Sequence, residues 1–294
     1  MKLEPREDWV YWVLLAHYAS TDTRKRYWKE RPDDLHAFLR AQPEWNELEP
    51  KLVQEAMLLN ALSEQGGSLI TLADAEYPQA LLTPATLRPP LVLYALGDVG
   101  ILAESPFVAF AGSRNASETA IQETRRLAGE IVQEGYHTIT GFAKGIDAVA
   151  AQTTLELGAK TIGVLAQGLL HRLTQQLARE FMNALNDNRL LFLSELHPNS
   201  SWSSRFAMMR NRIVAALGDF LIVVESGPEI SHRDGKTVHS GTFECAKTAH
   251  QIGRRVYTLD LPAEGNQQLL KRGIATLWGN LTPPSHPEQG VLFE

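Results

Sequence analysis

The first sixty residues carry apolar side chains at the three- and four-residue spacing of amphipathic helices. Three runs show this spacing: Trp9, Trp12, Val13 and Ala16, then Leu35, Phe38 and Leu39, then Leu52, Val53, Ala56 and Leu59. Pro32, Pro43 and Pro50 fall between the runs, where a proline is expected to separate one helix from the next. We therefore predict a small helical N-terminal domain over residues 1–66.

The helical spacing ends in a segment that is rich in proline. Pro78, Pro84, Pro89 and Pro90 fall within it, and the apolar run LVLYALG follows. Because a residue that precedes proline favours extended backbone, this segment is typical of an extended chain. We predict an extended connector over residues 67–106, which ends in a strand that packs on the next domain.

From residue 107 onward, six short apolar runs alternate with amphipathic stretches. The runs are FVAFAG, HTITG, TIGVLA, LLFLSE, DFLIVVES and RRVYTLD. Strands that alternate with helices indicate a parallel sheet, and near-continuous apolarity fits strands buried on both faces. We predict the α/β class: a Rossmann-like, doubly wound parallel sheet over residues 107–280, followed by a loose tail over residues 281–294.

Composition narrows the functional classes. The chain has 294 residues, enough for two domains, and its 44% hydrophobic and 21% charged content is that of a folded globular protein. The apolar run from Trp9 to Ala16 is too short to span a bilayer, so we expect neither a signal peptide nor a membrane partner. The net charge of −6 argues against a uniformly basic surface. Any nucleic-acid site must therefore be local.

The single cysteine, Cys245, bears on location and metal binding. One cysteine cannot form an internal disulfide, and no Cys or His lies near it at the spacing of metal ligands. We therefore expect a reducing, cytoplasmic location and no metal site.

Small, polar and basic residues follow the first two predicted strands. They are Gly112, Ser113, Arg114 and Ser117, then Gly141, Lys144 and Gly145. The carboxyl ends of parallel strands meet at one rim, where helix N-termini favour anions and glycines admit a close ligand. The glycines could instead serve tight turns, with Ser117 as a helix N-cap. A base beside each glycine turn favours a phosphate site.

These loops lack the established nucleotide fingerprints. The first loop does not have the G-x-G-x-x-G spacing, and no G-x-x-x-x-G-K-[ST] motif occurs in the chain. We therefore expect no NAD, ATP or other cofactor.

A local basic patch follows the fourth strand. The segment from Leu196 to Gly218 contains three arginines and no acid, which suits a sugar-phosphate backbone. We assign Arg210 and Arg212 to phosphate binding. The alternative is that one of them pairs with Glu195 or Glu225 and braces the rim.

A third group opens the helix after the fifth strand, and it consists of Ser240, Gly241 and Thr242. Ser240 or Thr242 is expected to cap that helix, whose free N–H groups would face the same rim. Glu244 is either an acid catalyst or, more commonly, a first-turn residue favoured by the helix dipole.

Two other features border the rim. Trp202 and Phe206 could stack on bases, but aromatic residues near a strand end more often belong to the core, where we place them. The polar stretch over residues 226–239 is expected to form an extra loop over the site.

With these residues in place, the chain resembles the DNA-processing protein A (DprA/Smf) family over about Leu52 to Leu277. The resemblance rests on an ordered series of motifs: Tyr77-Pro78 with Leu81, Pro89 to Tyr94 with Gly97, Ala111 to Arg114, Gly141 to Asp147, Thr161 to Leu165, Ser194-Glu195, Arg210 to Val214, Ser240 to Thr242, Gly253-Arg254 and Gly265-Asn266 through Gly273.

The resemblance implies single-stranded DNA bound in a positive pocket at the rim, with Arg114, Lys144, Arg210 and Arg212 on the phosphates. It also implies a homodimer or higher homo-oligomer formed through the Rossmann-like domain, and the loading of a RecA-type recombinase. The chain departs from the family at Gln152, where His is common, and it lacks the Tyr-Pro expected after the third strand. It also ends without the winged-helix domain of many relatives. We therefore expect a shortened, specialised member that works by binding.

Two alternatives remain open. The chain could restrain a protein partner, as an antitoxin for a cognate toxin or as a phage-defence component. It could also be an enzyme, because nucleotide phosphoribohydrolases combine Gly-Thr with a downstream Glu, as in Gly241, Thr242 and Glu244. Their usual spacing leaves two residues between Thr and Glu, and the single residue here turns the carboxylate by about 100° on a helix.

Overall fold

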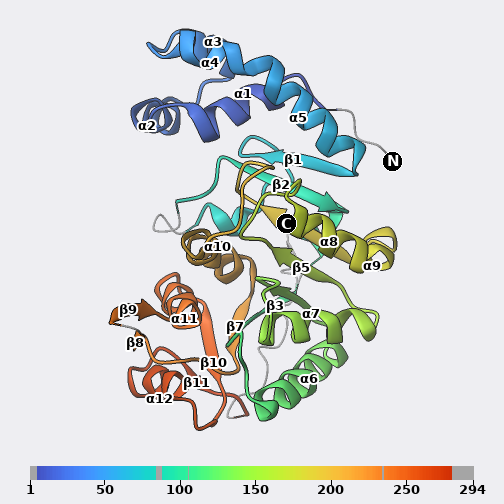
Figure 1. Ribbon diagram of the computed structural model, residues 1–294, viewed down its shortest axis with the longest axis vertical. Helices are drawn as coiled ribbons and strands as arrows, with labels where there is room; N and C mark the ends of the chain where they lie inside the picture. Colours follow the sequence, from blue (N-terminus) through green and yellow to red (C-terminus); the bar gives the residue numbers. More distant parts are fainter. Residues whose placement is uncertain (1–4, 84–87, 105, 234, 280–294) are drawn as a thin grey trace, which may run out of the picture.

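The computed structural model describes residues 5–83, 88–104, 106–233 and 235–279, so the tail predicted over 281–294 lies outside the described residues. Helices form one end of the molecule, and a sheet flanked by helices forms the rest (Figure 1). No helix in the described ranges is both long and apolar enough to cross a membrane.

The N-terminal end consists of short helices, as the apolar spacing predicts. They are α1 (Trp9–Val13), the π-helical turn η1 (Leu14–Tyr18), α2 (Thr21–Glu30), α3 (Leu35–Arg40), α4 (Trp45–Leu48), the 3-10 turn η2 (Glu49–Lys51) and α5 (Leu52–Glu64). Ser20 and Asp34 cap α2 and α3 by accepting hydrogen bonds from Thr23 N and Ala37 N. Trp12, Leu39 and other apolar side chains of these helices are buried together.

The central sheet has nine strands in the order β1-β2-β6-β5-β4-β3-β7-β10-β11. The strands are β1 (Gly67–Thr71), β2 (Val92–Gly97), β3 (Phe107–Ala111), β4 (His137–Thr140), β5 (Thr161–Val164), β6 (Leu190–Ser194), β7 (Phe220–Val223), β10 (Arg255–Thr258) and β11 (Thr276–Leu277). All neighbours from β6 to β11 pair in parallel. The predicted doubly wound parallel sheet is therefore confirmed, and all six predicted runs are strands.

The segment expected as a connector contributes two strands to this sheet. β1 pairs antiparallel with β2, and β2 pairs antiparallel with β6, so that Tyr94 lies opposite Ser194. Two short 3-10 turns, η3 (Gln79–Leu81) and η5 (Val99–Ala103), flank β2 along the chain. The segment is thus hydrogen-bonded into the sheet, which goes beyond the packing contact that we expected.

Helices cover both faces of the parallel strands (Figure 1). They are α6 (Glu118–Gln133), α7 (Ile146–Glu156), α8 (Arg172–Glu180), α9 (Met182–Asn186), α10 (Ser204–Leu217), α11 (Gly241–Gln251) and α12 (Glu264–Lys271). Side chains alternate along β3: Phe110 packs in the cluster that contains Leu127 of α6, and Ala109 in the cluster that contains Val214 of α10. This burial on both faces explains why the strands are apolar throughout.

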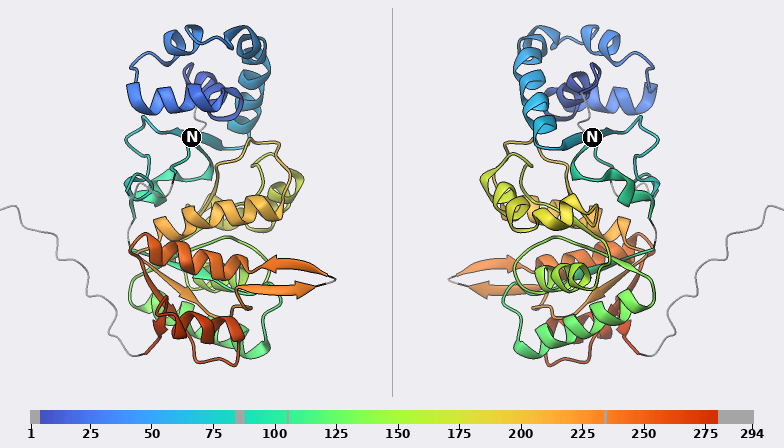
Figure 2. Two further views of the ribbon diagram at one scale, coloured as in Figure 1. Left: turned by 90° about the vertical axis from the view of Figure 1, so that its left-hand side faces the viewer. Right: turned by 90° about the vertical axis from the view of Figure 1, so that its right-hand side faces the viewer.

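The extra stretch over residues 226–239 forms a hairpin. β8 (Ile230–Arg233) pairs antiparallel with β9 (Lys236–His239), and the pair stands out from the body of the molecule (Figure 2). Periodicity did not indicate these strands, because ISHR and KTVH each contain a single aliphatic residue.

A polar cluster joins the N-terminal helices to the sheet. His17 of η1 shares a hydrogen bond with the hydroxyl of Tyr94 on β2, at 3.0 Å from Nε2. The carboxylate of Glu55 on α5 accepts from Tyr18 Oη at 2.7 Å and lies 3.0 Å from His197 Nε2. Burial, and to a smaller extent the neighbouring His197, lower the pKa of His17 to about 4. The cluster therefore ties the helical end to the loop that follows β6.

This cluster predicts a loss of stability in mild acid. The pKa of His17 is about 4 in the folded chain, whereas in the unfolded chain it has its ordinary value of 6.5. Between pH 6.5 and pH 4 the unfolded chain therefore binds more protons than the folded chain, and the free energy of unfolding falls as the pH falls. We expect urea unfolding to show about 2 kcal/mol less stability at pH 5 than at pH 7 from this group alone. His17→Gln should remove that difference, and an unchanged pH dependence in this variant would rule out the explanation.

Candidate nucleic-acid interface

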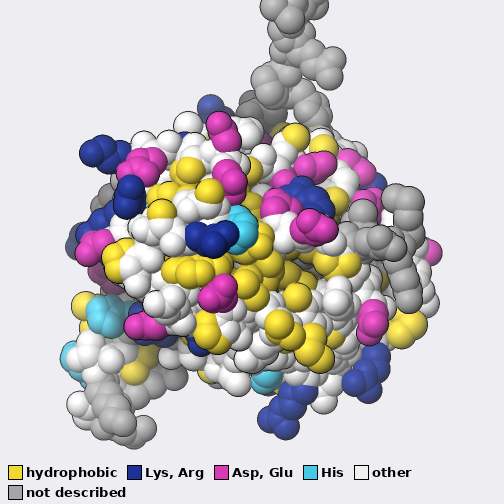
Figure 3. Space-filling model, turned by 90° about the horizontal axis from the view of Figure 1, so that it is seen from above, with side chains coloured by type: hydrophobic (Ala, Val, Ile, Leu, Met, Phe, Trp, Pro, Cys, Tyr) yellow, Lys and Arg dark blue, Asp and Glu magenta, His cyan; other side chains and the backbone are white. Residues whose placement is uncertain are grey.

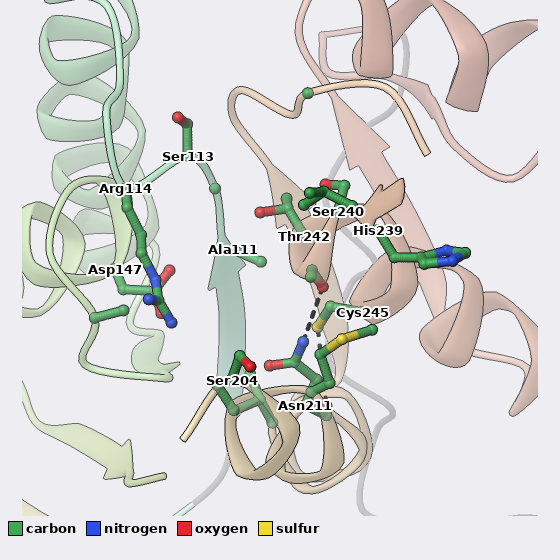
Figure 4. Close-up of a pocket in the computed structure, with 18 of the residues that line it drawn as sticks. Ala111, Ser113, Arg114, Asp147, Ser204, Asn211, His239, Ser240, Thr242 and Cys245 are labelled. Atoms are coloured by element: carbon green, nitrogen blue, oxygen red, sulfur yellow. Dashed lines mark hydrogen bonds between the residues drawn. The ribbon is translucent and has the colours of Figure 1, made fainter. Parts of the chain in front are cut away.

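A pocket of about 530 Å³ opens at the carboxyl end of β3. The strands that follow β3 along the chain are placed first on one side of it, starting with β4, and then on the other, starting with β7. Ligands of open parallel sheets bind at such a topological switch point. The loop after β3, the start of α7, one side of α10 and the start of α11 line the pocket (Figure 4). Ser231, Val238 and His239 of the hairpin form one wall, so the extra segment does border the site, as expected.

Arg114 is the basic residue that is available to a ligand of this pocket. Its side chain lines the pocket beside Asp147 (Figure 4). Within the described part of the chain, its guanidinium makes no hydrogen bond or ion pair, and its Cζ lies 4.9 Å from the ring centroid of Trp202 in a cation–π contact. Asp147 is close enough to attract the Arg114 charge, which opposes the rise that burial causes in the pKa of Asp147. The Arg114 charge therefore has an acidic neighbour but no direct hydrogen-bonded partner.

Arg210 also lines the pocket, but it is buried and faces an acid. Only 6% of Arg210 is exposed, its Nη1 lies 3.9 Å from Asp147 Oδ2, and its Nε has no described hydrogen-bond partner. Burial lowers the pKa of Arg210 and raises that of Asp147, although their attraction opposes both shifts. The pair is thus costly to bury, and an anion in the pocket would give Arg210 a second partner.

Arg212 does not belong to the pocket, contrary to the assignment from sequence. Both of its terminal nitrogens donate to the carboxylate of Glu195, Nη2 to Oε2 at 2.5 Å, and Nη1 also donates to Met209 O at 2.8 Å. Because i and i+2 positions of a helix point to different sides, α10 cannot turn both Arg210 and Arg212 toward the same pocket. The alternative of a bracing ion pair with Glu195 is therefore correct for Arg212.

Lys144 lies at the rim but outside the residues that line the pocket. It is exposed, it sits in the turn between β4 and α7, and no hydrogen bond or ion pair joins it to another described residue. The structure therefore leaves its charge free for a ligand that extends beyond the pocket.

The helix N-termini at this rim differ in whether a ligand can reach their N–H groups. At α6 the carboxylate of Glu225 already occupies this position, because its Oε2 accepts from Ser117 N at 3.1 Å and from Ser117 Oγ at 2.5 Å. Ser117 in turn caps α6 by accepting from Ala120 N. Ser117 is thus a structural N-cap outside the main pocket, as the alternative for this residue stated.

The start of α11 faces the pocket with all three predicted residues, Ser240, Gly241 and Thr242. Ser240 caps the helix by accepting from Phe243 N at 3.2 Å, as predicted. No described group accepts from the backbone N–H of Gly241 or of Thr242, so this helix end can hold an anion.

The glycines serve close packing between loops. A Cβ on Gly112 would lie 2.3 Å from the side chain of Ile146, and one on Gly141 would lie 1.3 Å from Arg210 Nη1. Of these glycines only Gly112 lines the pocket, whereas Gly141 and Gly145 do not. The alternative that the glycines allow tight turns fits Gly145, which has φ +89°, whereas Gly141 leaves room for the Arg210 side chain.

The pocket residues that were not assigned from the sequence include Asp147, Asn211 and Cys245. Asn211 Nδ2 donates to Gly241 O at 2.8 Å and so joins α10 to the start of α11 (Figure 4). Burial raises the pKa of the Cys245 thiol to about 12, which keeps it protonated and unreactive. Asp147 and Asn211 both fall within the motifs quoted above, but nothing local in the sequence signals their contacts.

Glu244 lies outside the residues that line the pocket. Its Oε1 accepts from Lys247 Nζ at 2.9 Å, and Lys247 also binds Glu229. This geometry fits the first-turn residue of a helix rather than an acid aimed at a ligand.

The family model for DNA recombination-mediator protein A matches residues 68–283 of the chain, and so covers the nine-stranded sheet except for Gly67 at the start of β1. The chain belongs to this family. The match includes all the pocket residues named above, whereas the N-terminal helices precede the matched region.

Curated relatives of this chain include the DNA processing protein DprA of Bacillus subtilis (strain 168), which is 29% identical over 241 residues that cover 79% of this chain and 75% of the relative. Protein Smf of Escherichia coli (strain K12) is 30% identical over 216 residues, which cover 71% of this chain and 54% of Smf. The chain thus spans about half the length of some of the relatives it matches.

Two solved structures of DNA processing protein A share the fold. The Streptococcus pneumoniae protein superposes with a TM-score of 0.69 at 22% identity and covers 94% of this chain and 95% of its own. The Helicobacter pylori protein, whose structure describes a single-stranded DNA binding mode, gives a TM-score of 0.60 at 26% identity over 72% of this chain and 92% of its own. The chain therefore has the fold of DNA processing protein A.

Proposed function

We propose that this protein binds single-stranded DNA through the sugar-phosphate backbone, at the pocket beyond β3 and along the adjoining rim. Arg114 and the start of α11 hold one phosphate in the pocket, and Lys144 holds a further phosphate outside it. The observation that carries this proposal is the guanidinium of Arg114, which makes no hydrogen bond or ion pair within the described residues and lies at the switch point of the sheet.

The surface supports a local site. Seen from the helical end, acidic and basic side chains are interspersed among apolar ones, and no uniformly basic area is present on that face (Figure 3). The net charge of −6 likewise argues against binding by a large positive surface. A few well-placed contacts therefore have to supply the affinity, and the DNA that the Helicobacter pylori relative binds is of the same single-stranded kind.

We propose binding rather than catalysis. The acid of the enzymatic alternative, Glu244, pairs with Lys247 outside the pocket, and the acid inside the pocket, Asp147, faces Arg210. The pocket thus offers cations and N–H donors to an anion without an unpaired carboxylate as a general base. We extend the proposal to self-association and to transfer of the bound DNA to a RecA-type recombinase in the cytoplasm, and the resemblance to the family supports this extension.

The salt dependence of binding tests this proposal. For single strands, the slope of log K against log salt is about −0.7 for each phosphate that the protein neutralises. With Arg114 and Lys144 each on one phosphate, we expect a slope of about −1.4 by fluorescence anisotropy with a labelled oligonucleotide. Lys144→Gln should reduce this slope by about one half, and duplex of the same length should bind more weakly.

The matched control is Lys25→Gln, because Lys25 is an exposed lysine of the N-terminal helix α2. It should leave the slope unchanged. The proposed interface would be contradicted by binding that does not respond to salt. It would also be contradicted if Lys144→Gln left the slope of log K against log salt unchanged while Lys25→Gln reduced it.

A further inference from the structure

Trp202 is exposed, although we expected it in the core. Its exposed fraction is 41%, and it lies in the segment between β6 and α10, two residues before Ser204 of the pocket wall. Met208 and Met209, on the first turns of α10, are also exposed, at 39% and 37%. A tryptophan that remains partly open to solvent beside a pocket is a common feature of binding surfaces.

The backbone around Trp202 is fixed by hydrogen bonds on both sides. On one side, Ser200 N donates to His197 O, and Gly168 N donates to Ser200 O, each at 2.8 Å. On the other side, Ser203 caps α10 by accepting from Phe206 N at 3.1 Å. The indole is therefore carried by an ordered segment, which lowers the entropic cost of binding a ligand against it.

Arg114 connects the indole to the pocket. The guanidinium lies over the ring of Trp202 at 4.9 Å from the centroid, and the same side chain lines the pocket. A group that binds the Arg114 charge is thus adjacent to an aromatic ring. In a nucleotide, one sugar separates the phosphate from the base, so a strand whose phosphate meets Arg114 brings a base close to Trp202.

We propose that Trp202 is a stacking platform for an unpaired base of the strand whose phosphate Arg114 binds. This inference rests on the proposed function and adds to it the residue that recognises the base. Every base has a π-face, so the contact tolerates any sequence. Bases of a duplex are already stacked on each other, and the contact therefore selects a single strand.

The test compares two oligonucleotides of equal length, one with all bases present and one made of abasic sites, which keeps the phosphates. We expect Trp202→Ala to weaken binding of the normal strand about ten-fold and to leave binding of the abasic strand unchanged. The salt slope of Trp202→Ala should equal that of the wild type, because no phosphate contact is lost. Trp202→Phe should restore most of the affinity, since it keeps an aromatic ring.

Met209→Ala is the matched control, because Met209 is an equally exposed apolar neighbour that lies outside the pocket lining. It should bind both strands as the wild type does. An equal loss of Trp202→Ala on both strands would show that the indole only positions Arg114, and would overturn the inference. Wild-type affinity of Trp202→Ala for the normal strand would overturn it too.

The results that contradict base stacking differ from those that contradict the proposed function. If Arg114→Gln weakens binding of both strands while Trp202→Ala does not, phosphate binding at Arg114 is retained and base stacking on Trp202 is excluded. If the wild type binds neither strand, the interface itself is wrong.

Discussion

Gly145→Ala is expected to destabilise the protein by about 4 kcal/mol, because backbone strain and steric overlap of the added Cβ act together at this position. Gly145 has φ +89° and ψ −132°, a backbone conformation that is essentially restricted to glycine. A Cβ there would also lie 2.2 Å from the backbone oxygen of Ser113 and 2.9 Å from Arg114 Cα. Backbone atoms cannot move aside as the end of a flexible side chain can, so the two loops would have to separate.

Urea unfolding checks this expectation, with Gly241→Ala as the matched control. Gly241 also lies at the start of a rim helix, but its φ is not positive, and the nearest atom to an added Cβ is Asn211 Nδ2 at 3.9 Å. We expect Gly241→Ala to change stability by less than about 1 kcal/mol. Similar stabilities of the two variants would show that the loops are not packed as described.

Arg212→Gln is expected to cost about 3 to 5 kcal/mol, because it leaves the Glu195 carboxylate buried without its cation. The side chain of Glu195 is 10% exposed and that of Arg212 18%. Truncating an exposed arginine is far less costly: Arg126, with a side chain 47% exposed, pairs with Glu123 on α6, and Arg126→Gln should cost less than about 1 kcal/mol.

The same variant separates stability from binding. At a temperature where Arg212→Gln is still folded, it should bind single-stranded DNA as tightly as the wild type does, since Arg212 does not line the pocket. Calorimetric unfolding and anisotropy on one preparation provide both readings. A stable Arg212→Gln protein that has lost DNA affinity would reverse the assignment of this residue.

The parallel sheet could be predicted from the sequence because its signal is local. Each strand is buried on both faces, so FVAFA and LLFLS are apolar at every position except the closing serine. The antiparallel pairing of β2 with β6 could not be predicted, because it joins residues that are about one hundred positions apart. The hairpin β8–β9 was missed since its strands are largely polar and lie outside the core.

The site could be predicted only in outline, because each cation's role depends on a distant partner. In the sequence, the four cations assigned to phosphate binding are not distinguished by which of them has an acidic partner: Arg114, Lys144, Arg210 and Arg212. Only the fold shows that Glu195 neutralises Arg212 and that Arg210 is buried against Asp147, while the other two bases stay free of direct partners in the described chain. Trp202 was placed in the core for the same reason: its exposure depends on how the segment before α10 crosses the rim.

Charge reversal at Arg114 tests the central claim most directly. Arg114→Glu and the control Arg125→Glu change the net charge equally, but Arg125 is an exposed residue of α6 outside the pocket. By fluorescence anisotropy with a labelled single-stranded oligonucleotide, Arg114→Glu should lose at least about ten-fold in affinity, because a charge-assisted contact becomes a repulsion. Arg125→Glu should bind within about two-fold of the wild type. Equal affinities of the two variants would contradict the account.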